Sequence, residues 1–185
     1  MYHIKEDKRS LTTSRMLYDA LIEQLNRKRV DEISVSELVT FAGIGRSTFY
    51  RNFDNIVDIL TWQCDLSFAK VIEDYYVIGR KSNVSMTEYI FDYWYNNSEV
   101  IEKLLAIKRI DIIYDSFIKN SKMFAAKINV TPIKNAIIEE YFLTVRIGIF
   151  ISVVKVWIEN GKKESPKQLS ALLTKQILHS AKNNC

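Results

Sequence analysis

Glycine and proline are scarce in this chain, and their positions constrain its fold more than any other feature. The 185 residues include only 5 Gly and 2 Pro, too few for an all-β fold rich in tight turns or for a long flexible linker. Both prolines follow a hydroxyl residue, in Thr131-Pro132 and Ser165-Pro166. Each pair is typical of an N-cap followed by the first helical residue. We therefore expect an all-α fold with one helix starting at each proline.

Capping signals and hydrophobic spacing divide the rest of the chain. Ser34-Val-Ser-Glu37 and Ser85-Met-Thr-Glu88 are capping boxes, in which a hydroxyl and a carboxylate satisfy free N–H groups at a helix start. Asn160-Gly161 is typical of a helix end. These signals predict about nine helices, with expected bounds of 11–29, 35–42, 46–52, 56–78, 86–95, 99–107, 110–126, 132–160 and 166–182.

The overall charge does not identify a partner. The chain has 26 basic and 22 acidic side chains, and the first 55 residues are nearly balanced. Its two cysteines, Cys64 and Cys185, lie far apart and form no disulfide framework. The amino terminus lacks the apolar core of a secretory signal, and the most apolar stretch, 141–158, contains Arg146 and Lys155. We expect a soluble cytoplasmic protein that does not bind membranes.

The sequence also argues against an enzyme. Its only histidines, His3 and His179, lie near the termini, without the nucleophile or carboxylate spacing of a catalytic site. It contains no Gly-rich phosphate loop and no histidine pair that would bind a metal. We expect no catalytic residues, no cofactor and no metal.

The segment 34–53 has the pattern of a helix-turn-helix, with two short helices around a glycine. Leu38, Ala42, Ile44 and Phe49 are spaced to face inward, and Gly43 permits a turn conformation that a side chain would oppose. The outward face of the second helix then presents polar groups that suit phosphate oxygens and base edges in a major groove. These groups belong to Arg46, Ser47, Tyr50 and Arg51.

This segment resembles the DNA-binding signature of the TetR family of bacterial transcriptional regulators. The resemblance rests on the Ala42-Gly43 turn, the run Ser47-Thr48-Phe49-Tyr50 and the closing Phe53. It implies a three-helix head at 1–55 and a helical body at 56–185 for dimerisation and ligand binding. It also implies a homodimeric repressor that binds an operator and responds to a small effector.

Carried over position by position, the resemblance makes Phe49 and Phe53 packing residues. The sequence departs from the family pattern at three positions. Asn52 stands where the family often has His, Ile56 where it often has a Lys that would contact phosphate, and Val39 where it usually has Ala at the helix crossing. The DNA-contacting residues that we predict are Ser36, Arg46, Ser47, Thr48, Tyr50, Arg51 and Asn52.

The last two helices are the predicted dimer interface. The stretch 141–158 is apolar nearly all round, so more than one side of it must be covered. The end of this helix and the turn to Pro166 are similar to a short TetR-like subgroup that includes a dihydroxyacetone kinase regulator. A four-helix interface would use Ile147, Gly148, Ile151, Ser152, Lys155, Leu169, Leu172, Leu173 and Gln176. The alternative is a single helix wholly inside one protomer.

Most aromatic residues lie in the body, where the resemblance implies an effector site. Candidate effector-binding residues are Trp62, Phe91, Trp94, Arg109, Tyr114 and Arg146. Aromatic residues at helical spacing are more often ordinary core, which is the alternative for these rings. The two arginines could bind an acidic effector or pair with Asp111, Glu139 or Glu140.

Two functions from different classes follow. The first is a sequence-specific DNA-binding regulator, whose partners are a double-stranded operator, a second copy of the chain and a small effector. The second is a helical adaptor or coactivator that acts mainly through protein contacts, which the balanced charge of the head and the hydrophobic Ile56 favour.

Overall fold

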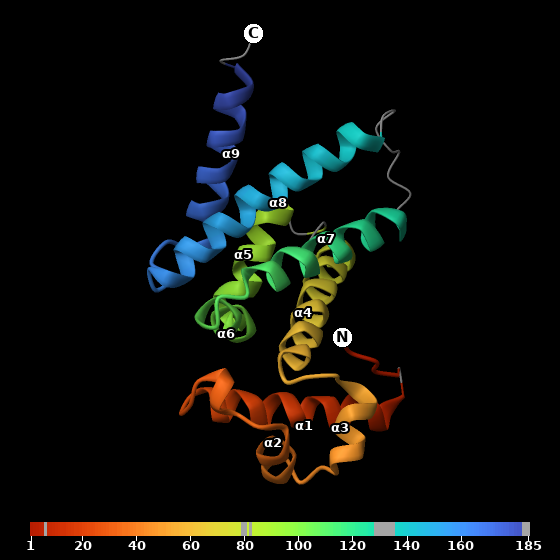
Figure 1. Ribbon diagram of the computed structural model, residues 1–185. Coiled ribbons are helices and arrows are strands. Elements are labelled where there is room, and N and C mark those ends of the chain that lie inside the picture. The colour runs from red at the N-terminus through yellow and green to blue at the C-terminus, as the bar shows by residue number, and fades with distance from the viewer. Residues whose placement is uncertain (6, 79–80, 82, 128–135, 183–185) are drawn as a thin grey trace.

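The computed structural model describes residues 1–5, 7–78, 81, 83–127 and 136–182, without the side chains of 124–127, 136, 139 and 176–182. Within these ranges the chain is all-α, as predicted, apart from one short 3-10 helix and an isolated bridge between Tyr2 and Phe53 (Figure 1). The helices are α1 Lys8–Leu25, α2 Val35–Phe41, α3 Arg46–Asn52, α4 Val57–Val77, α5 Met86–Asn97, α6 Glu99–Ala106, α7 Ile110–Lys127, α8 Ala136–Glu159 and α9 Pro166–Lys182.

The first helix differs from the prediction at both ends. It begins at Lys8 rather than at residue 11, because the Asp7 side chain caps it by accepting a hydrogen bond from the Ser10 N–H at 2.8 Å. It ends at Leu25 rather than at residue 29, and the 3-10 helix Val30–Glu32 follows. The cap at Asp7 is a sequence signal that the periodicity of the apolar residues did not reveal.

The helix-turn-helix has the predicted form. Ser34 caps α2 by accepting from the Glu37 N–H at 3.1 Å. Gly43 adopts a φ of +66°, which explains why a glycine stands there. The Ile44 N–H then donates to the Val39 carbonyl at 2.9 Å, which closes the turn before α3 begins.

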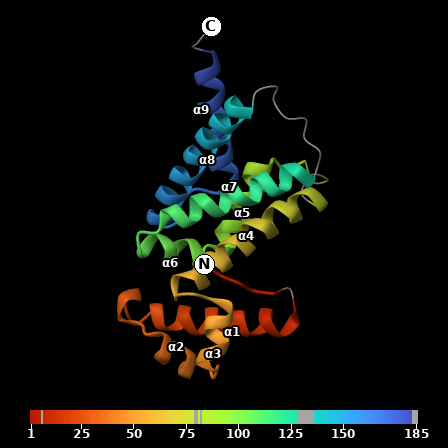
Figure 2. The same ribbon diagram turned by 45° about the vertical axis from the view of Figure 1, so that its right-hand side comes forward.

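The body is built on α4, which runs from the head into the rest of the protein (Figures 1 and 2). It packs along α7, which in turn contacts α8, while α5 packs against α9. Buried aromatic rings join these helices. Phe68 of α4 stacks on Phe117 of α7 with ring centroids 4.9 Å apart, and Phe91 of α5 lies 5.1 Å from Phe150 of α8.

The two carboxyl-terminal helices meet at the predicted turn. Gly161 has a φ of +79°, and Ser165 caps α9 by accepting from the Gln168 N–H at 3.3 Å. The predicted start of α9 at Pro166 is therefore confirmed. The predicted start of α8 at Pro132 lies outside the described residues. The description of α8 begins at Ala136.

Candidate nucleic-acid interface

Helix α3 is fixed to the head by one aromatic side. Phe49 and Phe53 are fully buried, with ring centroids 6.0 Å apart. Phe53 also meets Trp62 of α4 edge to face at 6.2 Å. Both phenylalanines were predicted to pack, and their burial confirms that prediction. The contact with Trp62 fixes the end of α3 against the first turns of the helix that leads into the body.

The opposite side of α3 is open to solvent. Arg46, Ser47 and Tyr50 are all exposed, and the Tyr50 side chain keeps 46% of its surface accessible. The Arg46 guanidinium carbon lies 5.6 Å from the centre of the Tyr50 ring, a cation–π contact that holds the charge next to the phenol. Ser36 of α2 is exposed as well. Guanidinium, hydroxyl and phenol groups on one exposed helix face can donate to phosphate oxygens and base edges.

Thr48 and Arg51 form the flank of this face that turns toward α1. The Arg51 Nη2 donates to the Thr48 hydroxyl at 3.2 Å. Asn52, which was predicted to contact DNA, is only 3% exposed. Its amide oxygen accepts a hydrogen bond from the Ser10 hydroxyl at 3.1 Å, which ties α3 to α1. Asn52 is thus a residue of the α1–α3 contact. Ile56 is buried too, at 9% exposure.

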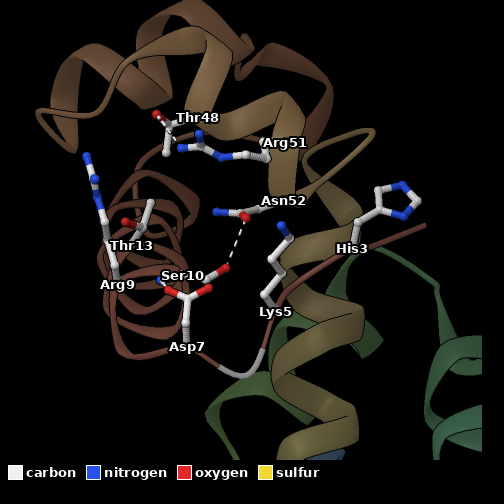
Figure 3. Close-up of a pocket in the computed structure, with 9 residues that line it drawn as sticks. All are labelled: His3, Lys5, Asp7, Arg9, Ser10, Thr13, Thr48, Arg51 and Asn52. Atoms are coloured by element: carbon white, nitrogen blue, oxygen red, sulfur yellow. Dashed lines mark hydrogen bonds between the residues drawn. The ribbon is translucent and has the colours of Figure 1, made fainter.

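A hollow of about 190 Å³ lies between this flank and the start of the chain. It is lined by residues of the amino-terminal arm, which is the described segment 1–5, by the first turns of α1 and by α3 (Figure 3). The lining residues are His3, Lys5, Asp7, Arg9, Ser10, Thr13, Thr48, Arg51 and Asn52. Sequence reasoning did not single out Lys5, Arg9 or Thr13. The available signal for Arg9 and Thr13 was their spacing of four residues, which places them on one face of α1, whereas Lys5 lies before that helix and carried no such signal.

The arm that closes this hollow is anchored to the body. Tyr2 bridges to Phe53, and its hydroxyl donates to Asp65 of α4 at 2.5 Å. Lys119 of α7 binds the same carboxylate. Burial and the Asp65 carboxylate raise the pKa of the Tyr2 hydroxyl, so it remains a donor. The arm therefore contacts the α3–α4 junction, α4 and α7 together.

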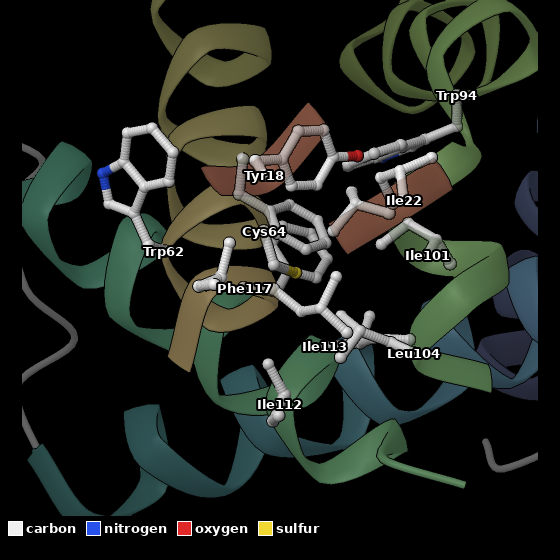
Figure 4. Close-up of a cluster of buried hydrophobic side chains, with 14 of the residues drawn as sticks. Tyr18, Ile22, Trp62, Cys64, Trp94, Ile101, Leu104, Ile112, Ile113 and Phe117 are labelled. Atoms are coloured by element: carbon white, nitrogen blue, oxygen red, sulfur yellow. The ribbon is translucent and has the colours of Figure 1, made fainter. Parts of the chain in front are cut away.

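The residues predicted for an effector do not converge on one cavity. Trp62, Phe91 and Trp94 are between 0 and 4% exposed and belong to the packed core, with Trp62 and Trp94 on opposite sides of the cluster in Figure 4. They serve as core because every side of each ring is covered by other side chains. Arg109 pairs with Asp111, whose carboxylate it meets at 2.7 Å, and this guanidinium lowers the pKa of Asp111.

The two other residues of that set lie apart from this core. Tyr114 is half-buried on α7, and Arg146 is exposed on α8. The six residues therefore do not form the predicted effector site in this conformation. The pairing of Arg109 with Asp111 also resolves one of the alternatives left open by the sequence.

Helix α8 has two different sides. Ile147, Ile151, Leu169 and Leu173, predicted for the dimer interface, are at most 6% exposed inside the protomer, because they pack on the body. Leu172 is 52% exposed, Ser152 is exposed, and Gly148 and Lys155 are partly exposed. The side chain of Gln176 lies outside the described residues. The outer side of α8 carries further exposed apolar side chains, at Tyr141, Phe142, Val145, Ile149 and Val156.

Part of the same helix passes a simple test for a membrane span. Among the described residues, Glu140–Glu159 is long and apolar enough, with a mean hydropathy of 1.8 and 28% of that stretch buried. Core helices of soluble proteins pass the same test, and this one packs its inner side on the body.

Comparison with known proteins agrees with the helical architecture. A family model described as the transcriptional regulator C-terminal region of TetR proteins matches residues 84–179, more than half of the chain. The chain belongs to the TetR family of transcriptional regulators. The match extends this TetR-family protein's likeness beyond the helix-turn-helix and the last two helices into the middle of the chain.

One curated relative and two solved structures are similar to the chain. The HTH-type dhaKLM operon transcriptional activator DhaS of Lactococcus lactis is 33% identical over 67 residues, which cover 36% of this chain and 36% of that protein. The match thus spans about a third of the curated relative's length. Lin0861 from Listeria innocua has the same fold, with a TM-score of 0.75, 16% identity and coverage of 96% of this chain and 95% of that one.

The third is a solved structure of the dihydroxyacetone kinase operon activator DhaS. It matches with a TM-score of 0.53 and 18% identity over 93% of this chain and 97% of that one. At this identity the two solved structures show the fold alone.

Proposed function

We propose that this protein is a homodimeric, cytoplasmic regulator that binds operator DNA through α3. The observation that carries the proposal is the division of α3 into two sides. Phe49 anchors the helix while Arg46, Ser47 and Tyr50 remain exposed and able to donate hydrogen bonds. A seven-residue helix is too short to persist without such packing. The packing therefore preserves the exposed polar face, as a groove-reading surface requires.

The outer side of α8 supports the homodimer. Tyr141, Val145, Ile149 and Val156 are between 43 and 69% exposed and recur at helical spacing. No atom lies within 4 Å of a Cβ built on Gly148, so a second helix has room to approach there. A second copy of the chain would cover this side and Leu172 of α9 in a twofold arrangement.

A twofold dimer would carry two copies of α3. Helix-turn-helix dimers place their recognition helices in successive major grooves, about 34–36 Å apart along the duplex. The operator would then be a pseudo-palindrome whose half-sites each meet Arg46, Ser47 and Tyr50 of one protomer.

The direction of regulation is a separate proposal. The relative DhaS is named as a transcriptional activator, which favours activation over the repression implied by the motif. The residues predicted for an effector lie apart, so the proposal includes no effector site. The second candidate function is an adaptor or coactivator that acts through protein contacts. The burial of Ile56, where family members often carry a phosphate-binding Lys, favours it.

Salt-dependent DNA binding separates the two candidates. The full-length protein would be titrated with labelled duplexes from the DNA next to its own gene, with mixed-sequence duplex as competitor, between about 50 and 200 mM salt. A regulator binds saturably, with affinity that falls steeply as salt rises, and Arg46→Ala weakens it. Arg27→Ala is the control, because Arg27 lies beyond the end of α1 and pairs with Glu23. An absence of saturable binding at the lowest salt would refute the regulator and favour the adaptor.

A further inference from the structure

The hollow beside α3 has the composition of an anion site. Lys5, Arg9 and Arg51 contribute cations from the arm, α1 and α3, and Thr13 and Thr48 contribute hydroxyls. No carboxylate among the described residues forms an ion pair with these three cations, although twelve ion pairs occur elsewhere. Three unpaired cations around one hollow repel each other unless an anion lies between them.

The two remaining charged residues of the lining already have partners. The Asp7 carboxylate accepts the N–H of Ser10 as the cap of α1, at 2.8 Å. His3 contacts Asp54 at 2.9 Å, and its ring points away from the hollow in Figure 3. The charge that faces the hollow is therefore positive, even with Asp7 at its base.

Asn52 provides an independent sign of a ligand. It is only 3% exposed, and its amide oxygen accepts the hydrogen bond from the Ser10 hydroxyl. Its amide nitrogen points into the hollow (Figure 3) and has no hydrogen-bond partner among the described residues. This nitrogen is not among the fully buried atoms that lack a partner, so solvent in the hollow reaches it, and its N–H can donate to an anion bound there.

We propose that this hollow binds one backbone phosphate of the DNA strand that passes α3. Thr48 and Arg51 line the hollow and also lie next to the exposed Ser47 and Tyr50, so a strand contacting that face runs past the opening. The volume of about 190 Å³ accommodates a phosphate group with several water molecules. Family members often have a phosphate-binding Lys at the position of Ile56. In this chain Lys5 and Arg9 would supply phosphate contacts instead.

This inference rests on DNA binding by α3, and the test separates the two. Affinity of the full-length protein for mixed-sequence duplex would be measured against salt for the wild type, Lys5→Ala and Arg9→Ala. Lys163→Ala is the matched control, because it removes one lysine from an exposed position before α9. Each lost phosphate contact is expected to lower the slope of log K against log salt by up to about 0.9, and a homodimer loses two such contacts per substitution, whereas the control keeps the wild-type slope.

A second measurement identifies the source of the phosphate. Inorganic phosphate would be titrated into isotope-labelled protein at constant ionic strength, and the side-chain amide signal of Asn52 would be followed by NMR. We expect that signal to shift, and Asn52→Asp, which places a carboxylate in the hollow, to lower DNA affinity at least tenfold. The melting temperature of Asn52→Asp checks that the head remains folded.

The outcomes are distinct. If the wild type binds duplex with a steep slope but Lys5→Ala and Arg9→Ala match Lys163→Ala, the phosphate site is refuted while the proposed function stands. A shift of the Asn52 signal with unchanged slopes would show a site for free anions and overturn the assignment to a DNA strand. Failure of the wild type to bind duplex would refute the proposed function itself.

Discussion

Removal of the Tyr50 hydroxyl tests the two-sided character of α3. The side chain is 46% exposed, whereas its neighbour Phe49 is fully buried. Tyr50→Phe retains the ring that contacts Arg46 and removes only the oxygen. We therefore expect the free energy of unfolding to change by less than about 0.5 kcal/mol, as for other surface substitutions.

The expected loss of DNA affinity is much larger. A hydrogen bond to a charged phosphate contributes about 1.5–3 kcal/mol, so each lost contact weakens binding roughly 10- to 150-fold, and a dimer loses two. Because a phenol carries no charge, the same number of counterions is released. The slope of log K against log salt should therefore not change.

The assay compares Tyr50→Phe with Phe49→Leu by fluorescence anisotropy on labelled duplex and by thermal unfolding. Phe49→Leu is expected to cost about 1 kcal/mol of stability, a shift in Tm of about 2–4 °C. Its DNA affinity should change only in proportion to the folded fraction. Unchanged affinity in Tyr50→Phe, or a fall in its Tm as large as that of Phe49→Leu, would refute the division of α3 into a packing side and a DNA side.

Substitutions at three further sites test other parts of the structure. Ile149→Glu places a charge on the outer side of α8 and should give a folded monomer in analytical ultracentrifugation; a dimer of unchanged affinity would contradict the proposed interface. Burial raises the pKa of Cys64 to about 12, so in a Cys185→Ser background its thiol should react with a disulfide reagent at pH 8 only after unfolding. Because an unfolded thiol ionises near 9, this group should also lower stability as the pH rises above 9, and Cys64→Ala should remove that part of the pH dependence. Lys119→Met leaves the buried Asp65 carboxylate without its cation and should cost about 1–2 kcal/mol in denaturant unfolding, discounted because Lys119 is half exposed. Adding Asp65→Asn should restore most of that loss, and a double variant as unstable as the sum of the single ones would argue against the pair.

Features set by short-range physics could be predicted from the sequence. The capping hydroxyls of Ser34 and Ser165 fixed the starts of α2 and α9, because a cap and its N–H lie three residues apart. The positive φ of Gly43 and Gly161 follows from the same local chemistry. These signals need no knowledge of what packs against the helix.

Features that depend on distant contacts could not be predicted in this way. Asn52 follows the buried Phe49 by three residues, so its spacing places it on the packing side of α3, although the family resemblance made it a DNA contact. Its partner, the Ser10 hydroxyl 42 residues earlier, could not be predicted from local sequence. Helix α8 is apolar all round, so its pattern did not reveal that Ile147 and Ile151 face the body while Ile149 faces outward. The aromatic residues of the body gave no sign of whether they enclose a cavity or fill a core.

The distance between the two copies of α3 tests the central claim most directly. A nitroxide label at position 40, which is exposed on α2 and outside the predicted DNA contacts, in a Thr40→Cys, Cys185→Ser variant with Cys64 buried, would report that distance, after correction for the offset between label and α3, by pulsed electron spin resonance on the DNA complex. A twofold dimer with one α3 in each of two successive grooves predicts a distribution centred near 34–36 Å. A protein that binds the duplex with no dipolar coupling between labels, or with a distance incompatible with successive grooves, would contradict the account.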